Sequence, residues 1–197
     1  MASYDTAWRL LHRIREALRQ RDERYKLKGI IEFDGADFGE QKDKGKKEVL
    51  VAIESKDWVD AKGRPKSSAG FAKVELGREA KIPAQQFLNK NVEPGSQVNT
   101  DGSRALVSIQ GVEGDNRVMA AQPEQLDLWL PWVQKWVENA KAWLQGTFHG
   151  VRREYFVRYL AEYNYRFNRR HDPDGLFHRA LTACAVAKPI RAHALFG

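Results

Sequence analysis

Residues 49–54, Val-Leu-Val-Ala-Ile-Glu, decide the fold class of this 197-residue chain. Their apolar run is almost continuous, which is typical of a strand inside a sheet that is covered on both faces. Before them, residues 29–34 (GIIEFD) predict a short strand that ends at its acid. After them, the alternation of residues 71–76 predicts a third strand with Lys73 and Glu75 facing outward. The first part of the chain is therefore expected to form a sheet.

Turns and a short helix follow these strands in the sequence. The charged residues 40–48 predict a loop, and the basic residues 57–69 predict a turn region. Residues 83–89 are typical of a short helix, because Pro83 suits a first helical turn. Residues 97–101 predict a fourth strand, which again ends in an acid.

The second half of the chain, and its first residues, have helical patterns. Helices are expected at 4–24, 126–145, 152–170 and 174–186. In the first of these, the apolar residues fall on one face and the Arg and Glu residues on the opposite face: Trp8, Leu10, Leu11, Ile14, Ala17 and Leu18. Three strands, a helix, a strand and then helices predict an α/β domain with a mixed central sheet and flanking helices.

The composition favours a basic, globular protein of the cytoplasm. Lys and Arg number 33 against 26 Asp and Glu, a net charge of +7, and the isoelectric point is about 9.5. Basic clusters of this kind either bind nucleic-acid phosphates or form solvated surfaces, and charge alone leaves both open. The single cysteine excludes a disulfide framework and a cysteine-rich zinc ribbon. No apolar run approaches the ~18 residues of a membrane span.

Two predicted strands end in aspartate, at Asp34 and Asp101. Carboxylates on neighbouring strands can share a divalent cation, as two-metal phosphoryl transfer requires. The alternative is structural, because Asp34-Gly35 and Asp101-Gly102 are also favourable turn dipeptides. The two residues alone do not decide between these interpretations.

Four ordered segments make the chain resemble the DDE-type insertion-sequence transposases, in the ISXO-like group that contains a WLPWV element. The most distinctive is WLPWVQKWVENAKAWLQGTFHGV at 129–151. The other three lie on both sides of it: TAWRLLHRIREA at 6–17, TDGSRAL at 100–106, and RYLAEYNYRFNRR with LFHRALTACAVAKPI at 158–190. The resemblance covers nearly the whole chain in the order of the family.

The resemblance implies an RNase-H-like fold, two Mg²⁺ (or Mn²⁺) ions and cleavage and strand transfer at transposon ends. Asp34 then matches the first catalytic acid, Asp101 the second, and Gln134 the third metal-binding position. Lys141 matches a basic residue that accompanies the three and contacts DNA phosphate. Further phosphate contacts are expected from four arginines of the C-terminal helices: Arg158, Arg166, Arg169 and Arg170. The implied partner is double-stranded DNA, bound by a homo-oligomer at the bacterial nucleoid without any membrane.

The chain departs from the family at the third position, where Glu, Asn or His is usual. The amide of Gln134 can coordinate a cation but carries no charge and cannot act as a base. Glu138, one helical turn later on the same face, could replace it. A catalytically inactive DNA-binding remnant therefore stays an alternative to the transposase, and a different RNase-H-like nuclease, such as a junction resolvase, is a second one.

The beginning of the chain also departs from the family, which starts with a zinc ribbon and a complete helix-turn-helix. We therefore expect an N-terminally truncated transposase. Residues 1–25 are expected to be the remnant of the helix-turn-helix and residues 26–170 the RNase-H-like catalytic domain. Residues 171–197 are expected to form a helical tail packed on that domain.

Overall fold

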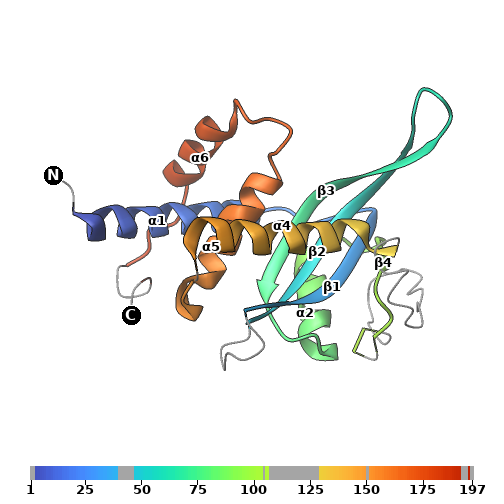
Figure 1. Ribbon diagram of the computed structural model, residues 1–197, viewed down its shortest axis with the longest axis horizontal. Helices are drawn as coiled ribbons and strands as arrows, with labels where there is room; N and C mark the ends of the chain where they lie inside the picture. The colour runs from blue at the N-terminus through green and yellow to red at the C-terminus, as the bar shows by residue number, and fades with distance from the viewer. Residues whose placement is uncertain are drawn as a thin grey trace. The chain divides into compact units, whose positions relative to one another are not determined.

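The computed structural model describes residues 3–39, 47–103, 105–106, 129–149, 151–191 and 195, which belong to two compact units (Figure 1). Residues 26–153 form the sheet-containing unit, and residues 1–25 with 154–197 form a helical unit. The expected boundary after residue 25 coincides with a limit of these units. Residues 154–170, expected in the catalytic domain, are grouped by their contacts with the helical unit. The functional division of the chain stays a prediction.

The sheet has four strands in the order β3-β2-β1-β4. They are β1 (Ile30–Phe38), β2 (Lys47–Val59), β3 (Pro65–Leu76) and β4 (Gln97–Asn99). The first three pair in antiparallel fashion, and β4 is parallel to β1. This mixed α/β arrangement confirms the predicted fold class and is compatible with an RNase-H-like fold (Figure 1).

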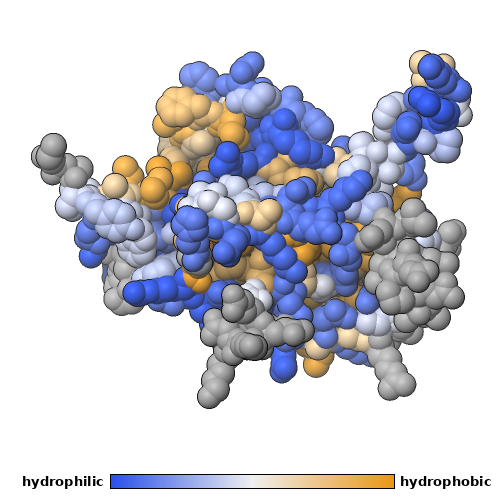
Figure 2. Space-filling model, in the orientation of Figure 1, coloured by the Kyte–Doolittle hydropathy of each residue, from blue (hydrophilic) through white to orange (hydrophobic). Residues whose placement is uncertain are grey.

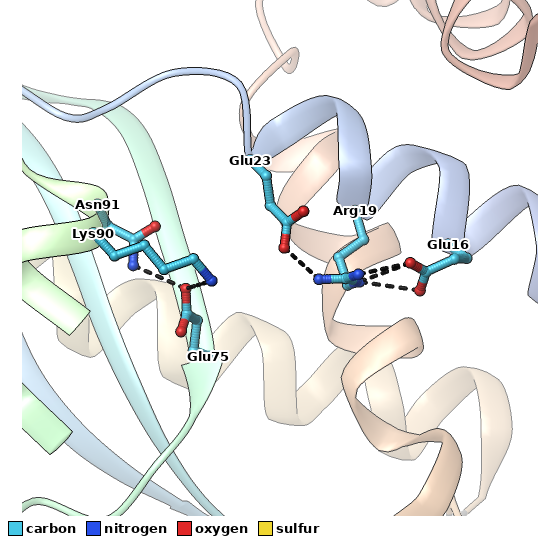
Figure 3. A network of polar contacts seen from close by, with 6 residues as sticks. All are labelled: Glu16, Arg19, Glu23, Glu75, Lys90 and Asn91. Atoms are coloured by element: carbon cyan, nitrogen blue, oxygen red, sulfur yellow. Dashed lines mark hydrogen bonds and ion pairs between the residues drawn. The ribbon is translucent and has the colours of Figure 1, made fainter. Parts of the chain in front are cut away.

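The apolar run of β2 occupies the centre of this sheet, as the sequence predicted. Residues 49–53 are at most 1% exposed. On one face, Phe33 of β1 stacks on Phe87 of α2 (Lys81–Asn91), with ring centroids 5.3 Å apart. The same helix is fixed to β3, because Glu75 accepts hydrogen bonds from Lys90 Nζ and Asn91 Nδ2, both at 2.9 Å (Figure 3).

The predicted alternation of β3 is wrong. Lys73 is buried at 5% exposure and Phe71 is exposed at 41%. Lys73 lies opposite the buried Ala52 in the regular part of the pairing, and a register shift between Ile53 and Ser55 of β2 interrupts the two-residue period next to Phe71. The buried Glu54 carboxylate lies at this irregularity and accepts the backbone N–H of Phe71 at 3.1 Å.

Residues 57–69, predicted as a turn region, are mostly strand. β2 continues to Val59 and β3 begins at Pro65, so that the two form a long hairpin (Figure 1). The turn is confined to the residues between them, where Gly63 has a φ of 76°. The lysines and arginine of this segment therefore lie on and around a β-ribbon.

The other face of the sheet is covered by α4 (Pro131–Phe148), which contacts β1 and β2. Pro131 suits the first turn of this helix. Its buried stripe has helical spacing: Val133, Trp136, Val137, Ala140 and Leu144. The helix begins later than predicted; residues 126–128 of the expected range lie outside the described residues.

A carboxylate of the sheet caps the start of α4. Glu32 of β1, only 2% exposed, accepts the backbone N–H groups of Trp132 at 2.8 Å and Val133 at 3.0 Å through Oε2. The N-cap residue itself, Leu130, makes no side-chain cap hydrogen bond. An acid from a neighbouring strand therefore satisfies N–H groups that a helix cannot satisfy itself, and its charge suits the helix dipole.

The helical unit contains α1 (Tyr4–Asp22), α5 (Arg153–Phe167) and α6 (Leu176–Ala185). Leu18 of α1, Tyr165 of α5 and Ala183 of α6 form its core. No helix within the described residues is both long and apolar enough to cross a membrane.

The buried face of α1 agrees with the sequence prediction at Ala17 and Leu18 but not at Leu10 and Leu11. Leu10 and Leu11 are 57% and 48% exposed, whereas Arg15 and Glu16 are buried. Arg15 is buried because its Nε donates to Glu162 of α5 at 2.7 Å and its guanidinium lies 4.0 Å from the Tyr159 ring centroid. Glu16 pairs with Arg19, which also contacts Glu23 (Figure 3).

We predict that Glu32→Ala destabilises the fold much more than Glu32→Gln. The alanine leaves the N–H groups of Trp132 and Val133 without their acceptor, which is expected to lower the unfolding free energy by about 2–4 kcal/mol. The glutamine keeps an acceptor oxygen and should lose less than half as much. Urea unfolding of the two variants measures the difference; equal losses would show that the cap does not hold the helix.

Candidate functional site

Asp34, the expected first acid, lies in the middle of β1 and not at its end. Residues 36–38 continue the strand because they pair with residues 47–49 of β2. The side chain is 8% exposed, and its Oδ1 accepts the N–H of Gly35 at 2.8 Å. The prediction of a strand-terminal acid is therefore wrong, and Asp34 is instead held within the paired sheet.

Asp101 lies in the loop after β4, which ends at Asn99, so the prediction of a strand that ends in this acid is also wrong. β4 pairs with β1 in parallel register, with Glu32 opposite Asn99. Asp34 lies two residues after Glu32, and Asp101 lies two residues after Asn99. Burial raises the pKa of Asp34 to about 7, and the negative charge of Asp101 contributes to this increase. The pairing of β1 with β4 therefore places the two predicted acids in the same region of the sheet.

A tight loop fixes Asp101. Its Oδ1 accepts the N–H of Ser103 at 2.9 Å, and Gly102 adopts a positive φ of 75°. The preceding residue, Thr100, accepts the indole N–H of Trp129 through its carbonyl at 2.9 Å. The loop after β4 is thus tied to the residues that precede α4.

Gln134, in the first turn of α4, points its amide at Asp34. Its Nε2 donates to Asp34 Oδ2 at 3.3 Å. Glu138 is exposed one turn later, and its charge is not among those that shift the pKa of Asp34. Lys141 lies further along α4, with its Nζ 5.6 Å from the Phe38 ring centroid. Of the two candidates for the third position, the structure places Gln134 against the acids.

Two acids near Asp34 were not found from the sequence. Glu32 lies two residues earlier on the same face of β1, and burial raises its pKa to about 7. Glu79, in the segment between β3 and α2, also raises the pKa of Asp34. Gly35 permits this approach, since a Cβ at its position would lie 2.5 Å from a Glu79 carboxylate oxygen. In the sequence, the glycine that follows Asp34 is the one feature that indicates such close packing.

A polar hollow of about 320 Å³ lies beside this part of β1. It is lined by Gly35, Asp37 and Glu48, and by Arg78 and Glu79 from the segment after β3. Arg78 Nε lies 3.3 Å from Glu48 Oε2, which offsets part of the negative charge. The hollow gives solvent an approach to the strand that carries Asp34.

The donor set suits a hard divalent cation without forming a complete carboxylate cage. Within the described residues, no three His, Cys, Asp or Glu side chains gather as a metal cluster. The available oxygen ligands are the carboxylates of Asp34 and Asp101, with the amide oxygen of Gln134 after rotation of that amide. Oxygen is the ligand that Mg²⁺ prefers, and a cation would relieve the repulsion between the two acids. The residues therefore fit a cation that is held by two charges and one neutral ligand.

The four predicted DNA-binding arginines lie in the helical unit, and all four make internal contacts. Arg169 pairs with Asp22 at 2.7 Å and lies 3.4 Å from the Tyr165 ring centroid. Arg158 donates to the carbonyl of Leu195 at 2.7 Å, and Arg170 to that of Phe167 at 2.9 Å. Arg166 is exposed, with Glu162 3.8 Å away. It is the most available of the four for a phosphate.

The raised pKa of Asp34 predicts that stability falls as the pH rises. The pKa of Asp34 is about 7 in the folded chain and near 3.8 in the unfolded chain, so the folded state binds more protons between these pH values. Without added metal, the free energy of unfolding of the parent should fall by on the order of 2–4 kcal/mol between pH 4 and pH 8. The Asp34→Asn variant should not show this fall. Urea unfolding in EDTA across this range measures it, with Asp174→Asn, at an exposed residue, as the control. An unchanged pH dependence would contradict the assignment.

Comparison with known proteins identifies the family. The family description that matches is the ISXO2-like transposase domain, over residues 26–168. No curated protein and no solved structure matches the chain. The matched range includes Asp34, Asp101 and Gln134, so the two adjacent acids lie within the family domain. The chain belongs to the ISXO2-like family of DDE-type insertion-sequence transposases.

Proposed function

We propose that residues 26–153 carry the catalytic site of a DNA transposase, which cleaves and joins DNA strands at insertion-sequence ends by metal-dependent phosphoryl transfer. The observation that carries the proposal is the pair of acids formed by Asp34 of β1 and Asp101 of the loop that follows β4. Glu32 of β1 pairs with Asn99 of β4, two residues before each acid, and the charge of Asp101 contributes to the raised pKa of Asp34, which supports a shared cation. Membership in a transposase family makes DNA the general partner.

Each residue of the site has a distinct role in this proposal. Asp34 and Asp101 hold two Mg²⁺ or Mn²⁺ ions, and Gln134 completes the ligand set with its amide oxygen. The metal supplies Lewis-acid chemistry at the scissile phosphate and lowers the pKa of an attacking water or 3′-hydroxyl. Glu32 keeps the first turn of α4, and with it Gln134, at the correct distance from the acids.

Each unit by itself offers an exposed basic residue for a contact with DNA. Lys141 on α4 is exposed on the helix that carries Gln134, and Arg166 is exposed on α5. The net charge of +7 favours association with a polyanion through release of bound counterions. We propose a homo-oligomer on DNA at the bacterial nucleoid, because joined transposon ends need more than one active site.

Plasmid nicking with Mn²⁺ tests the catalytic proposal. We expect the purified chain to nick supercoiled DNA and Asp101→Asn to reduce the rate at least 100-fold, because one of only two charged ligands is lost. DNA affinity should change less than threefold. The matched control is Asp174→Asn, which removes one carboxylate from the helical unit. Cleavage that survives Asp101→Asn would overturn the assignment.

A second function, DNA binding without cleavage, is favoured by the contact of Gln134. This residue turns an N–H towards Asp34, and an amide brings no charge to the third position. If this position limits the reaction, Gln134→Glu or Gln134→His should raise Mn²⁺-dependent nicking at least tenfold.

The controls separate this defect from a loss of fold. Gln134→Ala should not raise nicking, and all three variants should bind DNA like the parent. No gain from either the glutamate or the histidine would exclude the third ligand as the cause of low activity.

A further inference from the structure

The hairpin of β2 and β3 extends beyond the sheet as a two-stranded arm. β1 pairs with β2 only as far as Ser55 opposite Ile30, whereas β2 and β3 stay paired out to Val59 and Pro65. We define the arm as residues 56–68. Figure 1 shows it projecting from the sheet, and Figure 2 shows that its surface is largely hydrophilic. Two-stranded ribbons are marginally stable in water, so packing within the unit does not explain this length.

The tip of the arm is held by its own hydrogen bonds. The carboxylate of Asp60 accepts the backbone N–H groups of Lys62 at 2.9 Å and Arg64 at 3.0 Å, and the Nε of Arg64 at 2.8 Å. The acid of the tip is therefore directed at the turn and paired with Arg64. This leaves Lys62, in the same turn, exposed with its charge uncompensated by Asp60.

The register of the arm places its charges on one face. Trp58 pairs with Lys66, and Lys56 with Ser68, so these four side chains share a face of the ribbon. Trp58 is 50% exposed there. Lys56 is 60% exposed, and its Nζ lies 3.8 Å from Glu54 at the base of the arm. Asp57, which lies between Lys56 and Trp58 in the sequence, is on the opposite face of the ribbon.

We propose that this arm enters the major groove of double-stranded DNA, with its basic face on the phosphates. The proposal rests on the proposed function, which makes DNA the partner. Four strand residues span about 13 Å, and the groove, about 12 Å wide and about 8.5 Å deep, admits a two-stranded ribbon. Lys56, Lys62 and Lys66 then contact phosphates along the groove, and Trp58 packs its ring against the wall of the groove.

The test compares two triple variants of the full chain that remove equal charge. The arm variant carries Lys→Gln at Lys56, Lys62 and Lys66. The matched control carries Lys→Gln at three other exposed lysines: Lys28, Lys81 and Lys188. Fluorescence anisotropy with a labelled DNA duplex should show at least a tenfold loss of affinity for the arm variant and less than threefold for the control. The slope of log affinity against log salt should fall by about 2–3 for the arm variant.

Two further measurements test the groove and the tryptophan. A-form RNA duplexes have a narrow, deep major groove that excludes a ribbon. The factor by which the arm variant loses affinity should therefore be at least five times larger for DNA than for RNA. An equal loss for the two duplexes would overturn groove entry.

The variants of Trp58 test the placement of its ring. Trp58→Ala should weaken DNA binding, and Trp58→Phe should bind within threefold of the parent. No effect of Trp58→Ala would contradict the placement.

The outcomes distinguish this inference from the proposed function. Equal affinities of arm variant and control would overturn the inference, while Mn²⁺-dependent nicking by the parent would still support the catalytic site. Loss of DNA binding in the arm variant alone, with no nicking by any protein, would support the arm and count against catalysis. A parent chain that binds no DNA would overturn both. Unfolding temperatures within two degrees of the parent, expected because the arm lies outside the core, exclude misfolding as the cause.

Discussion

The hydrogen bonds that the first turn of α4 donates to the carboxylate of Glu32 are the interaction on which the candidate site depends. They join the centre of the sheet to the helix that carries Gln134, and they act at the end of the helix nearest the acids. A shift of α4 by one turn would move Gln134 about 5.4 Å along the helix axis, away from Asp34. The apolar stripe of α4 fixes which face meets the sheet, but a stripe permits sliding. The Glu32 cap prevents it.

This arrangement places two buried acids on the same face of one strand. Glu32 and Asp34 are two residues apart on β1, and burial raises the pKa of each to about 7. A fold selected for stability alone would place apolar residues under α4, because desolvated carboxylates are costly. The backbone N–H groups of α4 offset the cost for Glu32. Asp34 has fewer donors and a like charge nearby, which is the pattern expected where a site needs an acid for a ligand.

The sequence predicted the order and type of most elements, because apolar periodicity is a local property. It correctly indicated the central position of residues 49–53 and the helix after β3. The errors have non-local causes. Asp34 lies within a strand because residues 47–49 pair beyond it, and α1 buries Arg15 because Glu162 lies on α5, far away in the sequence. Glu79 and Glu32 have no motif of their own, and only the folded chain brings them to the site.

The contact between Gln134 and Asp34 has opposite effects on stability and on metal binding. A carboxylate at this position would add a third negative charge beside Asp34 and Asp101, whose repulsion already helps to raise the pKa of Asp34. The amide instead donates a hydrogen bond to Asp34 and stabilises its charged form. The site is therefore better tolerated without metal than one with three acids would be. The same neutrality is expected to weaken the attraction for a cation, so the residue that avoids a third negative charge here is also expected to slow the proposed chemistry.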